Sequence, residues 1–113
     1  MERKIEMSVR IVHDGYVISA YLKGELDHHS LIPVRTEIDT QLQLCSPTLL
    51  LLDFSEVSFM DSSGIGLILG RMRVMDAIGG RVAITNPNDY AAKLIRLAGL
   101  SSLILEPRKD KKS

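Results

Sequence analysis

The residues best suited to chemistry lie in one short stretch, where hydroxyl and carboxylate side chains precede an apolar helical pattern. It reads Asp61-Ser62-Ser63-Gly64 and follows a run of four leucines at residues 49–52. A serine hydroxyl at a helix start lies near unpaired backbone N–H groups and the positive end of the helix dipole, where a phosphate can be accommodated. Either serine can be the modified residue while the other is a helix cap, and local spacing does not choose between them.

Small residues continue into the helix that this stretch begins. Gly64, Gly66 and Gly70 each cost a helix about 1 kcal/mol relative to alanine, so we interpret them as a small surface that a binding partner approaches closely. Apolar residues at spacings of three and four are expected to pack this helix on a sheet. They are Ile65, Ile68, Leu69, Met72 and Met75, with Arg71, Arg73 and Asp76 on other faces.

A catalytic role for Ser62, with Asp27, His28 or His29 as partners, is disfavoured. The nucleophile elbow requires glycine two residues before the serine, and Met60 occupies that position. Adjacent side chains at 27–29 cannot easily converge on one metal ion, and no second pair of ligands stands at helical spacing. We therefore predict no catalytic residues, no metal site and no enzymatic activity.

Nucleotide binding is a weaker alternative. Gly64, Gly66 and Gly70 resemble a dinucleotide-binding loop, but the third glycine comes one residue too late for G-x-G-x-x-G. No P-loop motif is present. The sequence predicts no cofactor, although a small GTP- or ATP-binding protein stays open as an alternative function.

Alternation and turn residues place the other elements. Residues 7–12 alternate as a first strand, Asp14-Gly15 predicts a tight turn of the primed type, and residues 16–23 form an antiparallel second strand that Gly24 closes. The run of leucines at 49–52 predicts a central strand covered on both faces, with a connection from Asp53 to the next helix. The other expected elements are a helix with apolar positions Leu31, Val34, Ile38, Leu42 and Cys45, a strand at 81–85, a helix after residues 86–89 that Gly99 caps, and an edge strand at 103–105. The prediction is an α/β fold with a mixed sheet of about five strands and three or four helices.

Composition limits the class of protein. The 113 residues form a single domain, 1–113, and 14 basic and 14 acidic residues give no net charge, which argues against nucleic-acid binding. No apolar run is long enough for a membrane span and no secretory signal is evident, so we expect a cytoplasmic protein that needs no membrane. The single cysteine cannot form an internal disulfide, and residues 106–113 are a polar tail expected to be disordered.

Two blocks resemble a known family. Residues 59–66, Phe-Met-Asp-Ser-Ser-Gly-Ile-Gly, are similar to the phosphorylation segment of STAS-domain anti-sigma factor antagonists, and residues 24–29, Gly-Glu-Leu-Asp-His-His, to the segment before their first helix. Together the blocks are most similar to the anti-sigma F factor antagonists of sporulation, over about residues 3–105. The family's last helix is not evident in residues 106–113, which contain Pro107 and lack apolar periodicity.

The resemblance implies a phosphorylation-controlled binding protein. Its unmodified form would bind an anti-sigma factor that is also a serine kinase, which releases a sporulation sigma factor. Phosphorylation of Ser62 would end the interaction, and a metal-dependent serine phosphatase of the PP2C type would restore it. The residues implied in partner binding are Asp27, Asp61, Ser63, Gly64 and Gly66. We expect a monomer, and a STAS module of a stress-response complex is a second alternative.

Overall fold

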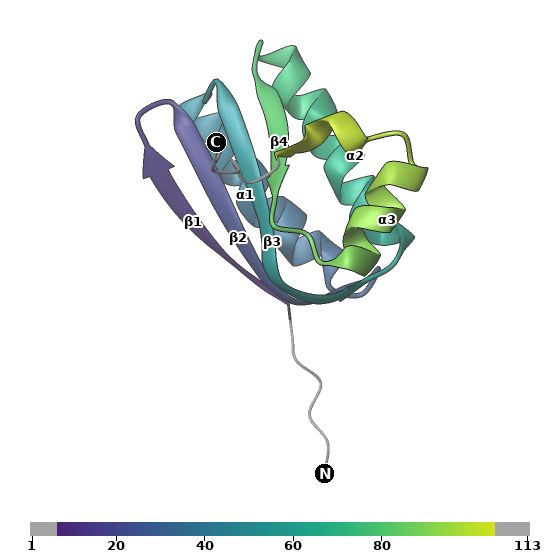
Figure 1. Cartoon of the computed structure of the whole chain (residues 1–113). Helices are drawn as coiled ribbons and strands as arrows, with labels where there is room; N and C mark the ends of the chain where they lie inside the picture. Colours follow the sequence, from purple (N-terminus) through teal and green to yellow (C-terminus); the bar gives the residue numbers. More distant parts are fainter. Residues whose placement is uncertain (1–6, 106–113) are drawn as a thin grey trace, which may run out of the picture.

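The computed structural model describes residues 7–105, and residues 1–6 and 106–113 lie outside the described part. Five strands form one mixed sheet in the order β1-β2-β3-β4-β5, with the helices against one of its faces (Figure 1). The elements are β1 (Ser8–Asp14), β2 (Val17–Leu26), α1 (Leu31–Cys45), β3 (Leu49–Met60), α2 (Ser62–Ala77), β4 (Arg81–Thr85), α3 (Asp89–Leu97), a 3₁₀ turn (Ser101–Leu103) and β5 (Ile104–Leu105). The predicted α/β fold with a mixed sheet is confirmed.

The hairpin between β1 and β2 is antiparallel, as predicted, but its turn lies one residue further on. Asp14 pairs with Val17, so Gly15 and Tyr16 form the loop. Gly15 has a φ of 63°, while Tyr16 has a negative φ, the combination that a type II′ turn requires. The remaining three strands follow in parallel from β2.

Two strands are longer than predicted. Gly24 does not close β2, because the strand continues to Leu26 through an irregular register with Gly24 at a φ of 112°. The predicted connection after Asp53 is also strand, since β3 runs to Met60 and stays paired with β2. The alternation of apolar and polar residues expected of a strand is disturbed here by the bulges, which each insert an unpaired residue.

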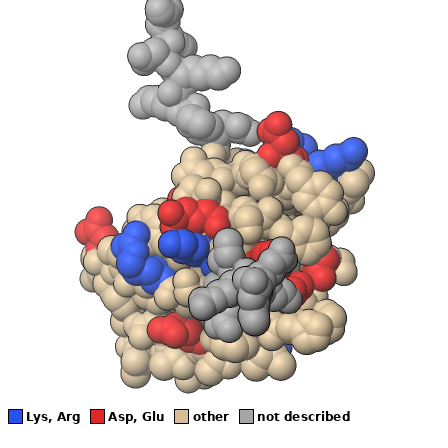
Figure 2. Space-filling view, turned by 90° about the horizontal axis from the view of Figure 1, so that it is seen from below, with Lys and Arg blue, Asp and Glu red and all other residues tan. Residues whose placement is uncertain are grey.

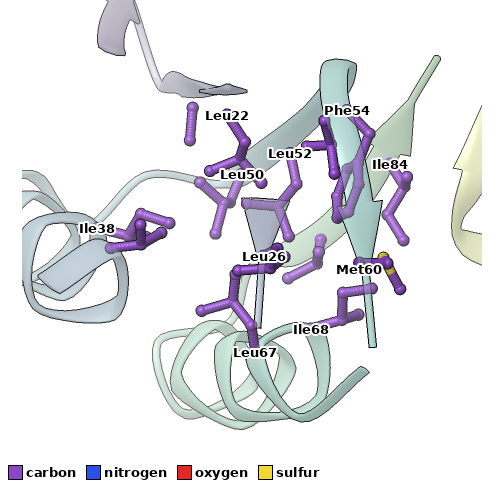
Figure 3. Packing of buried hydrophobic residues seen from close by; sticks show 14 of the residues in the cluster. Leu22, Leu26, Ile38, Leu50, Leu52, Phe54, Met60, Leu67, Ile68 and Ile84 are labelled. Carbon is purple, nitrogen blue, oxygen red and sulfur yellow. The ribbon is translucent and has the colours of Figure 1, made fainter. Parts of the chain in front are cut away.

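One face of the sheet provides the core. Ile18 and Ala20 of β2 lie in register with Leu50 and Leu52 of β3, and the leucines are completely buried. Figure 3 shows these leucines among Leu22, Leu26, Ile38, Met60, Leu67 and Ile68. Leu49 and Leu51 point to the opposite face and are only half-buried. The strand is central, as predicted, but the expectation that both faces are fully covered is wrong because the helices cover one face.

Helix α2 differs from the predicted pattern at two positions. Leu69 is 42% exposed, whereas Arg71 is buried and contacts α1. Nε of Arg71 lies 3.0 Å from Oδ1 of Asp39. Burial lowers the pKa of Arg71, and nearby Arg35 adds to this, while Asp39 opposes it. The guanidinium is retained inside because it pairs with a carboxylate on the neighbouring helix.

The C-terminal elements agree with the prediction. Asn88 caps α3, accepting a hydrogen bond from the Ala91 amide at 2.8 Å, and Gly99 follows the helix with a φ of 81°. Strand β5 is short and pairs with the end of β4. The predicted disordered tail at 106–113 lies outside the described residues. No helix within residues 7–105 is long and apolar enough to cross a membrane.

Candidate functional site

Ser62 is the first residue of α2, and its side chain is exposed. The helix cap is Asp61, and neither serine has this role: Oδ1 of Asp61 accepts a hydrogen bond from the Ser63 amide at 2.8 Å. The Asp61 carbonyl accepts a second one from the Gly64 amide at 2.9 Å. Ser63 is half-buried, so Ser62 is the more accessible of the two hydroxyls.

This capping changes what the helix start can offer to a phosphate. Two of the backbone amides expected to be unpaired at the helix start, those of Ser63 and Gly64, already donate hydrogen bonds to Asp61. The Asp61 carboxylate also already lies at the positive end of the helix dipole. Within the described residues, the Ser62 hydroxyl has no hydrogen-bond partner and therefore no base that would activate it as a nucleophile. Ser62 is thus an accessible hydroxyl at the start of a helix whose first amides are already bonded.

The β2–α1 loop lies beside Ser62 because β2 and β3 finish side by side. The Asp61 amide donates to the Leu26 carbonyl at 3.2 Å, which places Asp27 next to the start of α2. Oδ1 of Asp27 accepts hydrogen bonds from the amides of His29 and Ser30 at 3.0 and 3.1 Å. These bonds give the loop a defined shape, so the two sequence blocks form one edge of the molecule.

The two glycines predicted to contact a partner lie in different environments. Gly66 is exposed, and a Cβ added there would have no atom within 4 Å. Gly64 is buried, and a Cβ there would lie 3.0 Å from Sδ and Cε of Met60 and 3.2 Å from Cδ2 of Leu26. Packing therefore explains the small size of Gly64, while its contact with a partner stays a prediction.

The molecule seen from below carries charges of both signs. Figure 2 shows acidic and basic groups on this face, some of them side by side, with uncharged areas between these groups. Among residues 7–105, no three histidine, cysteine or acidic side chains are placed to hold a metal ion.

A buried polar network that the sequence did not indicate lies where the middle of β3 pairs with the end of β4. Asp53 is 8% exposed and accepts hydrogen bonds from Ser55 Oγ at 2.6 Å, Thr85 Oγ1 at 2.9 Å and Asn86 Nδ2 at 2.9 Å. Burial acts to raise the pKa of Asp53, but the combined hydrogen bonds from Ser55, Asn86 and Thr85 lower it below its ordinary value. Asn86 has a φ of 57°, a left-handed conformation that asparagine tolerates. The only signal for this network in the sequence was a polar residue after each apolar strand segment, Asp53 after residues 49–52 and Asn86 after residues 81–85.

Comparison with known proteins agrees with this architecture. Residues 8–112 match the family model of the STAS domain. An anti-sigma F factor antagonist of Lysinibacillus sphaericus is 36% identical over 89 residues, which cover 79% of this chain and 76% of the relative. This chain belongs to the STAS-domain anti-sigma factor antagonists.

Two solved structures extend the likeness of this antagonist to three dimensions. The anti-sigma factor antagonist SpoIIAA in its unphosphorylated form is 33% identical, with a TM-score of 0.80 over 90% of each chain. The Bacillus cell fate determinant SpoIIAA in the phosphorylated form has a TM-score of 0.74 at the same 33% identity, over 90% of this chain and 93% of that one. The resemblance predicted from the two sequence blocks is confirmed at the level of the family and of the fold.

Proposed function

We propose that the unmodified antagonist binds an anti-sigma factor through the edge formed by the β2–α1 loop and the start of α2. Binding would release a sigma factor of sporulation, as the resemblance of the two sequence blocks to the anti-sigma F factor antagonists implies. The protein would act as a regulatory binding partner and a kinase substrate, and not as an enzyme. Because sigma factors direct bacterial RNA polymerase, this function would be carried out in the cytoplasm.

The observation that carries the proposal is the exposed Ser62 hydroxyl at the start of α2. It lies between two features suited to recognition: Asp27 on a loop held by its own hydrogen bonds, and Gly66 with open space around it. A structural relative of 33% identity has been solved in both an unphosphorylated and a phosphorylated form. These features support a serine that controls whether a partner can dock.

Phosphorylation would end the interaction through charge. A phosphoserine carries about −1.5 to −2 charges at neutral pH, and burying it against a partner requires its desolvation. Asp61 already places one negative charge beside it. We propose that the anti-sigma factor itself is the serine kinase and that a PP2C-type phosphatase returns the antagonist to its binding form.

The proposal is tested by incubating the purified protein with ATP and the anti-sigma F factor from the same genome. Intact mass should rise by one phosphate, and peptide mapping should place it on Ser62. Ser62→Ala should take up no phosphate and should keep most of its affinity, because loss of one exposed hydroxyl costs little. Ser63→Ala is the matched control and should be phosphorylated normally.

Phosphate uptake by Ser62→Ala would transfer the site to Ser63. Absence of both binding and phosphorylation in the wild-type protein would contradict the proposed function. Saturable GTP or ATP binding to the antagonist alone, measured by equilibrium dialysis, would favour a nucleotide-binding protein instead.

A further inference from the structure

Two aromatic rings stand together on the surface next to the proposed binding edge. Phe59 of β3 and Tyr90 of α3 have ring centroids 6.4 Å apart and an angle of 18° between their planes. Phe59 is 44% exposed and Tyr90 53% exposed. The chain has two phenylalanines and three tyrosines, so a large share of its few aromatic rings is exposed at one place instead of filling the core.

The stack does not contribute to the buried core. The core is made by Leu26, Met60, Ile68 and similar buried residues, and neither ring belongs to it. Exposed aromatic pairs gain little in the free protein, whereas tyrosine and other aromatic side chains are enriched where a partner excludes water. The pair is therefore better explained by binding than by stability.

Chain connectivity places Phe59 within reach of any partner that covers Ser62. Three peptide units separate these residues, so their Cα atoms are at most about 11 Å apart. A typical interface buries about 800 Å² of each partner, a patch about 30 Å across. A protein that docks on Ser62 and Gly66 at this scale extends over Phe59 and, through the stack, over Tyr90.

Charges around the stack describe the surface that would fit it. Glu25 is the cross-strand neighbour of Phe59, Asp61 follows two residues later, and Asp89 precedes Tyr90. The nearest cation along α3 is Lys93, one turn further on. An apolar centre with mostly acidic neighbours is complementary to an apolar surface that carries lysine or arginine at its rim.

We propose that the Phe59–Tyr90 stack is a second contact point for the anti-sigma factor, which would meet it with an apolar patch rimmed by basic residues. The inference rests on the proposed function and adds to it a contact on α3, outside both sequence blocks. Tyr90 would make the antagonist selective for its partner, and Ser62 would control whether docking occurs.

Affinity for the purified anti-sigma F factor from the same genome, measured by titration calorimetry with the full chain, tests this proposal. Tyr90→Ala should weaken binding about tenfold or more without changing the melting temperature. Leu44→Ala is the matched control, because Leu44 is an apolar residue that is 74% exposed and lies in the last turn of α1, at the other end of that helix from the β2–α1 loop; its affinity should stay at the wild-type value. Phe59→Ala should weaken binding by the same factor as Tyr90→Ala. If Phe59→Ala does not fold, because Phe59 lies in β3, the affinity of Tyr90→Ala alone tests the proposal.

The outcomes separate the inference from the proposed function. Wild-type affinity in Tyr90→Ala, together with weaker binding in Gly66→Leu, would overturn the aromatic contact and leave the proposed function standing. Failure of the wild-type protein to bind would overturn both. Self-association of the wild-type chain that Tyr90→Ala abolishes would assign the stack to a second copy and also overturn the proposal.

The basic rim has its own measurement. Asp89→Asn should slow association several-fold at low salt and flatten the dependence of the association rate on ionic strength. Faster association in this variant would show that the partner presents negative charge, and the proposed rim would be wrong.

Discussion

Phosphorylation of Ser62 should change recognition while leaving the fold and its stability almost unchanged. The helix dipole favours an anion at this position by about 0.3 to 1 kcal/mol. The Ser63 and Gly64 amides are already bonded to Asp61, at 2.8 and 2.9 Å, so the phosphate gains no free donor from them. Repulsion from the Asp61 carboxylate costs roughly 1 kcal/mol per unit charge at about 4 Å in water. Both terms grow with the charge of the phosphate, so they offset each other to within about 1 kcal/mol.

The expected effects on stability and on binding therefore differ in size. A change in unfolding free energy below about 1 kcal/mol corresponds to a shift in melting temperature of less than about 6 °C for a domain of this size. Binding would lose about 3 kcal/mol or more, a factor above a hundred in affinity, because the partner must bury the new charge. Thermal unfolding, amide NMR spectra and calorimetric titration of the two forms measure these quantities.

Asp61→Asn provides a sharper version of the same test. Asparagine keeps the cap, since its side-chain oxygen can still accept from the Ser63 amide, but it removes the repulsive charge. Phosphorylation of this variant should therefore raise the melting temperature slightly, where in the wild-type protein it has almost no effect. Spectral changes spread over the whole sheet, with a large shift in melting temperature, would show a conformational switch and refute the electrostatic account.

Three further predictions concern single side chains. Gly66→Leu should weaken partner binding, measured by calorimetric titration, at an unchanged melting temperature. Gly64→Ala should instead lower the free energy of unfolding by about 1 to 3 kcal/mol, measured by thermal unfolding, because its Cβ would be too close to buried atoms. Asp53→Ala should cost about 1 to 3 kcal/mol above pH 5, measured by urea unfolding, because three side-chain donors lose their acceptor. The pKa of Asp53 is lowered in the folded protein, so its contribution to the free energy of unfolding is present above its unfolded pKa of about 3.9 and is lost as the pH falls through the folded value. If the stability of the wild-type protein fell no more steeply in acid than that of the variant, this prediction would be wrong. Asp39→Asn should destabilise the protein by about 1 to 3 kcal/mol by leaving the Arg71 charge buried without a counter-charge, and unchanged urea unfolding would show that the pair is neutral.

Local patterns were sufficient to predict most of the fold. The Asp-Gly turn, the polar cap before α2 and the glycine after α3 are short-range signals, and every predicted element is present, with most of the ends within a few residues of the predicted ones. The ends of β2 and β3 were wrong because a bulge interrupts alternation, so a paired strand looks like a loop in the sequence. The ends of β2 and β3 are fixed by pairing between residues more than thirty positions apart, such as Leu26 with Met60.

The site could be predicted from sequence only as far as its residue types. Ser62 and Asp61 follow from the start of a helix, but the assignment of the cap to Asp61 required coordinates, since three neighbouring polar residues could fill that position. The Asp53 network and the Phe59–Tyr90 stack each join residues about thirty positions apart. No local spacing indicates contacts of that kind.

The prediction for α2 was wrong about which side of the helix is exposed, and the exposed side is the one that matters for the proposed function. Arg71 is buried against Asp39 on one side of the helix, while Ser62, Gly66 and Leu69 all lie on the exposed side. These positions are three and four residues apart, so they form one stripe along the helix. Under the proposed function, a partner that lies along this stripe would cover Ser62 at its first position and would have to bury the charge of a phosphate there. The buried ion pair would then have a role beyond packing, since the side of α2 opposite to it is the one that the anti-sigma factor would reach.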